Sequence, residues 1–129
     1  MEYYYKNTLH NLTFNEAIEE VTKALKKEGF GVLTQIDIKA TLKKKLDVEF
    51  YNYMILGACN PSFAYKALLA EDKIGTMLPC NVIVQEREKG VIEVSAVNPI
   101  ASMQAIKNPS LMDISGEVSD TLKRVVDNL

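Results

Sequence analysis

The chain has 129 residues, of which 47% are hydrophobic and 25% are charged, and its formal net charge is −2. This length and composition are those of one globular domain, residues 1–129, with enough apolar side chains to build a core. The small negative charge argues against a nucleic-acid partner. A membrane span needs about 18 consecutive apolar residues, and no apolar run in the sequence approaches that length. The opening residues do not resemble a signal peptide, so we expect a cytoplasmic protein without a nucleic-acid or membrane partner.

The chain contains two cysteines, Cys59 and Cys80, and a single histidine, His10. Two cysteines are too few for a disulfide scaffold, and in a reducing cytoplasm both are expected to be free thiols. A zinc site with four protein ligands needs more cysteine and histidine ligands than these three residues supply. We therefore expect no metal and no cofactor.

Residues 2–10 alternate between two sets of side chains, which predicts a half-buried strand. Tyr3, Tyr5 and Leu9 share the parity expected to face the core, and His10 falls on the wetter side. A tyrosine-rich strand of this kind has the character of a sheet edge that needs cover. Because twofold pairs dominate among soluble homo-oligomers, we expect a homodimer.

A helix is predicted over residues 13–28. Thr13 and Glu16 have the spacing of a capping box, in which each side chain satisfies a free backbone amide of the first turn. Gly29 follows the last apolar position, as expected of a residue that ends a helix. The apolar residues between these ends recur at helical spacing: Phe14, Ala17, Ile18, Val21 and Leu25.

The next three segments read as strand, short helix and strand. Residues 30–38 form the first strand, Asp37 is expected to cap its end, and residues 39–46 form a short helix with its lysines in solvent. Residues 51–59 are nearly all apolar, which is typical of a strand that is covered on both faces.

Three Asn-Pro steps predict helix starts, with asparagine as the N-cap and proline preset for the first turn. Asn60 would begin a helix over 61–71, Asn98 a short helix, and Asn108 the final helix over 109–127. Gly116 within that last helix costs about 1 kcal/mol against alanine, which weakens the prediction of an unbroken helix.

Residues 80–86 and 91–97 have the pattern of a hairpin. Strands with helices at either end of the chain favour an α+β fold over a doubly wound parallel sheet. We predict a two-layer sandwich with a mostly antiparallel sheet of about five strands. The apolar stripes of helices 13–28 and 109–127 need a common partner, so both helices are expected on one face of this sheet.

The stretches "GFGVLTQIDIKATLKKKL", "ILGACNP" and "LPCNVIVQE" resemble the domain of unknown function 302 family, over nearly the whole chain. The resemblance implies a compact α+β domain with a mostly antiparallel sheet, and it implies little about activity. Family members usually carry an acid where this chain has Gln35, so any role of an acidic pair there is reduced to Asp37. The remaining pattern residues stand as in the family: Cys59, Asn60, Pro61, Pro79, Cys80 and Asn81.

If strands 51–59 and 80–86 are antiparallel neighbours, Cys59 and Cys80 lie at the same end of the sheet. The start of the 61–71 helix lies there too, and a helix N-terminus lowers the pKa of a nearby thiol. Asparagine amides can hold an anion or polarise a carbonyl, although they cannot act as bases. The candidate ligand-binding residues are therefore Cys59, Asn60, Cys80, Asn81 and Asn98.

The sequence leaves three hypotheses for function. The first is a small-ligand-binding domain with its site near Cys59 and Cys80, and the second is a thiol-dependent redox enzyme that uses both cysteines. The third is an oligomeric interaction domain in which the motifs serve only the fold. We expect one thiol to be buried and the other to lie at a pocket edge, with Cys80 the more accessible because it opens its strand out of a loop. No complete catalytic set of residues is present, which favours the first and third hypotheses.

Overall fold

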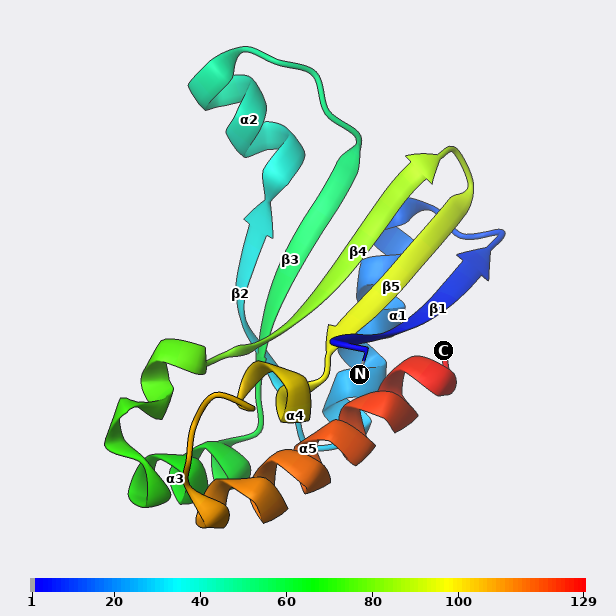
Figure 1. The fold of residues 1–129 in the computed structure, drawn as a ribbon. Coiled ribbons are helices and arrows are strands. Elements are labelled where there is room, and N and C mark those ends of the chain that lie inside the picture. Colours follow the sequence, from blue (N-terminus) through cyan, green and yellow to red (C-terminus); the bar gives the residue numbers. More distant parts are fainter. Residues whose placement is uncertain (1) are drawn as a thin grey trace.

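A computed structural model describes residues 2–129 of the chain. The elements follow in the order β1 (Tyr4–His10), α1 (Phe14–Lys27), β2 (Gly31–Asp37), α2 (Ile38–Leu46), β3 (Asn52–Cys59), α3 (Pro61–Ala70), the 3₁₀ helix η1 (Asp72–Met77), β4 (Cys80–Glu88), β5 (Val91–Val97), α4 (Pro99–Ser102) and α5 (Pro109–Asp127). Figure 1 shows α3 at one end of the sheet and α2 at the other.

The five strands form one sheet in the order β1-β5-β4-β3-β2, and all neighbouring pairs are antiparallel. The predicted antiparallel pairing of β3 with β4 is confirmed, with Ala58 opposite Cys80. β1 and β2 are the two edges, so the tyrosine-rich strand is an edge strand as expected. This register brings the end of β3 and the start of β4 to the same end of the sheet.

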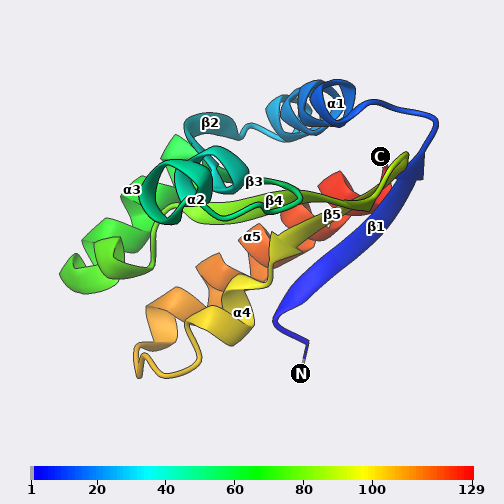
Figure 2. The same cartoon turned by 90° about the horizontal axis from the view of Figure 1, so that it is seen from above.

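Helices α1 and α5 pack on the same face of the sheet, as predicted, and share one core with it. The buried residues of α1 are Ala17, Val21 and Leu25. On β4, Val82 and Val84 face this helix layer. Because side chains alternate along a strand, the residues between them lie on the other side of the sheet. The predicted α+β sandwich is therefore confirmed, and Figure 2 shows α1 and the sheet from above.

The opposite side of the sheet is open over its middle strands, and we call it the open face. It carries alternate residues of β3, β4 and β5, among them Tyr53, Ile55, Asn81, Ile83, Gln85, Glu93 and Ser95. The prediction that residues 51–59 are covered on both faces is wrong. Leu56 and Ala58 are fully buried beneath the helices, whereas Tyr53 and Ile55 are only half-buried. An all-apolar strand thus contributes its second face to a surface, not to a core.

The predicted helix caps are confirmed. The Thr13–Glu16 capping box has both of its hydrogen bonds. The side chains of Asn60, Asn98 and Asn108 each accept a hydrogen bond from a backbone N–H of the first turn that follows. These polar caps explain why four helices begin where the sequence places them.

Three features of the helices could not be read from the sequence. The 3₁₀ helix η1 carries the fully buried Ile74, which packs with Ala67 and Leu111 in a second, smaller core between α3 and α5. Helix α2 has no buried residue at all. Gly116 does not break α5, which runs unbroken through it.

Candidate functional site

The two cysteines lie together at the end of the sheet where α3 begins. Cys80 is the first residue of β4 and faces the helix layer, and Cys59 is the last residue of β3, opposite Gly31 of β2. Asn60 follows Cys59 and caps α3, because its Oδ1 accepts from the backbone N–H groups of Ser62 at 3.1 Å and Phe63 at 3.3 Å. The predicted meeting of both thiols with a helix N-terminus is thus present in the fold.

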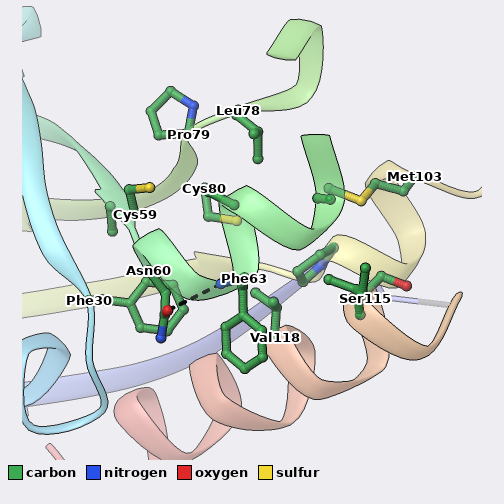
Figure 3. Close-up of a pocket in the computed structure, with 15 residues that line it drawn as sticks. Phe30, Cys59, Asn60, Phe63, Leu78, Pro79, Cys80, Met103, Ser115 and Val118 are labelled. Atoms are coloured by element: carbon green, nitrogen blue, oxygen red, sulfur yellow. Dashed lines mark hydrogen bonds between the residues drawn. The ribbon is translucent and has the colours of Figure 1, made fainter. Parts of the chain in front are cut away.

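Cys59, Asn60 and Cys80 border one small cavity between the sheet, α3 and α5 (Figure 3). Its volume is about 30 Å³. A cavity of this size holds about one water molecule, because a water needs at least about 10–15 Å³ and drug-sized pockets begin near 300 Å³. Its walls are mostly apolar side chains, including Phe63, Leu78, Met103 and Val118. In this conformation the cavity is closed to anything larger than a single small molecule such as water.

The two thiols differ in exposure, and the expected order is wrong. Cys80 is buried, with 9% of its surface exposed, whereas Cys59 is half-buried. Burial, and secondly the neighbouring Cys59 thiol, raises the pKa of Cys80 to about 11. Cys80 opens its strand out of a loop, but it shares the face of its partner Ala58, which lies beneath the helices. The face of the strand on which Cys80 lies therefore decides its burial, although the residue comes directly after a loop.

The three asparagines of the candidate set do not converge. Asn60 borders the cavity, but its oxygen is engaged by the helix cap. Asn81 is exposed on the open face, since it follows the buried Cys80. Asn98 is buried and fully engaged: its Nδ2 donates to the carbonyl of Glu2 at 3.1 Å, and its Oδ1 accepts from Ser119 Oγ at 3.0 Å. The structure thus brings together Cys59, Asn60 and Cys80 only.

A larger concavity lies on the open face, and we call it the tyrosine hollow. Its volume is about 480 Å³. Tyr3, Tyr4 and Tyr53 line it, and polar side chains of the middle strands complete it, including Asn81, Gln85, Arg87, Glu93 and Ser95. Tyr3 was expected on the core-facing parity of its strand; instead it precedes β1 and is 69% exposed.

Sequence reasoning missed this hollow, although a signal for it exists. On one parity of the 80–86 strand, Asn81 and Gln85 are polar, and they stand where a strand with two buried faces would carry apolar side chains. The Gln85 amide donates to the Tyr51 hydroxyl at 3.3 Å, and the Arg87 guanidinium lies over the Tyr51 ring, 5.6 Å from its centre. These contacts order the aromatic rim beside the hollow.

The acidic residues at the far end of the sheet have structural roles. Asp37 was expected to cap the end of its strand; instead it is the N-cap of the helix that follows, α2, where it accepts a hydrogen bond from the Ala40 N–H at 2.9 Å. Glu86 accepts from the Gly90 N–H and from the Asn52 amide, each at 3.0 Å, and these hydrogen bonds lower the pKa of its carboxyl. Within residues 2–129, no group of three or more histidine, cysteine, aspartate or glutamate side chains is placed to hold a metal ion.

The structure defines a class: a two-layer α+β protein whose helices cover one face of a five-stranded antiparallel sheet and leave the other open. The chain belongs to the family described as Domain of unknown function DUF302, whose model matches residues 5–129. This confirms the resemblance seen in the sequence. None of the helices in residues 2–129 is long and apolar enough to cross a membrane.

Two known proteins are similar to this chain. The crystal structure of an uncharacterized conserved protein DUF302 from Bacillus stearothermophilus matches with a TM-score of 0.88 and 29% sequence identity, over 98% of each chain. An uncharacterized protein of Aquifex aeolicus (strain VF5) is 28% identical over 88 residues, which cover 59% of this chain and 61% of that protein. The family match establishes the fold, whereas a function has to be inferred from the geometry of the site.

Proposed function

We propose that this protein is a binding domain, for a small molecule or another protein surface, and that its recognition surface is the open face of the sheet. One observation carries the proposal: one face of the sheet is sealed by α1 and α5, while the other presents half-buried apolar side chains and the tyrosine hollow to solvent. A sheet face with apolar side chains and no cover is the usual character of an interaction surface.

The chemistry of the tyrosine hollow supports recognition. Its volume of about 480 Å³ falls within the range of about 300–1,000 Å³ that is typical of ligand pockets. Tyrosine rings supply broad apolar contact with a polar tip, and Gln85, Asn81 and Ser95 supply hydrogen-bonding groups of fixed direction on the strands. Arg87 and Glu93 add one charge of each sign.

The absence of tryptophan from the chain allows a direct test, because a single introduced tryptophan has no background. Asn81→Trp reports on the open face, and Tyr65→Trp on the exposed surface of α3 is the matched control. We expect acrylamide to quench the Asn81→Trp protein several-fold less than the Tyr65→Trp protein, because a partner or ligand covers position 81. Equal quenching of both variants would show a bare face and contradict the proposal.

A ligand site at the sheet end near Cys59, Asn60 and Cys80 is a second candidate, which would require the cavity to open. The half-buried Cys59 at the cavity border favours it. The related alternative, a thiol-dependent redox enzyme, needs both thiols to react in turn. The raised pKa of Cys80 opposes this, since the thiolate is the reactive form.

Thiol titration of the native protein separates these alternatives. We expect a thiol reagent to modify Cys59 readily and Cys80 only after unfolding, because Cys80 is buried and protonated. The Cys59→Ser variant, which leaves Cys80 as the only thiol, should then be unreactive until denaturant is added. Modification of both thiols at similar rates in the folded protein would favour the redox enzyme.

Two separate proposals accompany this one: self-association as a homodimer, and a cytoplasmic location. The uncovered apolar side chains of the open face support the first, because a second copy of the sheet would bury them. Two free cysteines support the second, since reduced thiols persist in a reducing compartment.

A further inference from the structure

We infer that a second copy of this chain covers the open face, so that the two sheets pack face to face with Arg87 of each copy against Glu93 of the other. The inference rests on the proposed function of the open face and names its partner. It places the contact on the face of the sheet and not along the β1 edge.

The apolar content of the open face calls for cover. Tyr53 and Ile55 of β3 and Ile83 of β4 are half-buried by their neighbours alone, and Ile36 of β2, paired with Ile55, remains 45% exposed. Burial of such side chains stabilises an association in proportion to the apolar area that is removed from water. A facing sheet would bury all four residues, because sheets stack at about 10 Å with interdigitating side chains.

The size of the face suits a dimer. Five strands spaced about 4.8 Å apart, with about seven residues rising about 3.3 Å each, give a flat area of roughly 500 Å². Counted over all five strands, two such faces together bury roughly 1,000 Å², which is the lower limit expected of a specific interface. The face is therefore large enough for one partner domain of this size.

The charges of the face are complementary to themselves. Gln85 pairs with Glu93 in the β4–β5 register, and Arg87 lies two residues further along β4. Among residues 2–129, Glu93 forms an ion pair with Lys6 at 4.0 Å, and Arg87 contacts the Tyr51 ring and lies close enough to Glu93 for their opposite charges to attract. A twofold axis between Arg87 and Glu93 exchanges their positions, so each meets the opposite charge on the other copy. A partner whose surface carries a single charge sign would repel one of the two residues; nucleic acid, for example, would repel Glu93.

Charge reversal tests this pairing between copies. In Arg87→Glu the dimer would oppose two pairs of negative charges, and in Glu93→Arg two pairs of positive charges. We expect the dimer dissociation constant of each variant to be about tenfold or more higher than that of the natural chain, measured by sedimentation at low salt. An equimolar mixture of the two variants should regain the affinity of the natural chain, because each mixed dimer has both pairs restored.

The exposed pair Lys23 and Glu20 on α1 gives matched controls, since α1 covers the other side of the sheet. Lys23→Glu and Glu20→Arg make the same charge changes and should leave the association unchanged. A monomeric natural chain would overturn the inference, as would a dimer indifferent to both open-face reversals. A third outcome would also overturn the inference: native mass spectrometry finds a monomer with a bound small molecule, and the Asn81→Trp side chain is protected from acrylamide. That outcome would leave the proposed function, a binding surface on the open face, standing.

Discussion

At the scale of single residues, the two cysteines show how strand parity sets chemistry. Cys59 and Cys80 occupy the same end of the sheet, yet one is half-buried and the other sealed. Cys80 faces the helix layer beside the fully buried Ala58 and Val82. Desolvation in that layer disfavours the thiolate, which raises the pKa of Cys80 to about 11.

The raised pKa predicts a loss of stability at alkaline pH. An unfolded cysteine ionises near pH 9, whereas folded Cys80 ionises near pH 11, so the unfolded state binds fewer protons between these values. Stability is full below about pH 9 and falls as pH rises toward about 11, by roughly 2–3 kcal/mol at about 1.4 kcal/mol per pKa unit. Urea unfolding from pH 8 to about pH 11 should show this fall in the natural chain and a smaller one in Cys80→Ala. Tyrosine and lysine titrate alike in both proteins, so parallel curves would contradict the assignment.

At the scale of elements, glycine marks where strand β3 meets its neighbours most closely. A Cβ at Gly57 would overlap the Thr34 hydroxyl oxygen of β2 and lie 2.8 Å from Pro79 Cγ. The segment that leads into Cys80 therefore packs directly on the β3 backbone. By contrast, a Cβ at Gly116 in α5 would meet no atom within 4 Å.

These two glycines predict opposite effects of one substitution. Gly57→Ala should lower the free energy of unfolding by about 1–3 kcal/mol, because the added methyl group forces the neighbouring chain apart. Gly116→Ala should raise it by up to about 1 kcal/mol, because alanine is the better helix former and has room. Chemical denaturation measures both, and a Gly57→Ala protein as stable as the natural chain would contradict the close contact.

At the scale of the whole molecule, one buried hydrogen-bond network ties the ends of the chain to its middle. Asn98 joins Glu2, before β1, to Ser119 on α5, and the Tyr5 hydroxyl also bonds to Ser119. A buried side chain with its polar groups satisfied in this way is a structural link. Asn98 was a candidate for ligand binding on the basis of its motif. In the structure, the hydrogen-bonding groups of its side chain are occupied by contacts within the protein.

Much of this architecture was predictable because it depends on local physics. The capping box at Thr13, the Asn-Pro helix starts and the strand periodicity act within a few residues, so the sequence alone determines the elements and the α+β class. The antiparallel pairing of β3 with β4, which brings Cys59 and Cys80 to one end, was expected from the family resemblance and not from local physics, because the long connection through α3 and η1 would also allow a parallel crossover. The 3₁₀ helix η1 escaped prediction because a single short turn carries too little periodicity.

Only the tertiary structure decided which face of each strand is covered. Residues 51–59 are apolar on both parities, so their composition cannot say that Leu56 enters a core while Ile55 remains on a surface. The same choice of face sealed Cys80 beneath the helices and left Asn81 and the tyrosine hollow open. Burial depends on where α1 and α5 pack, and that packing is a sum over contacts between residues far apart in the chain.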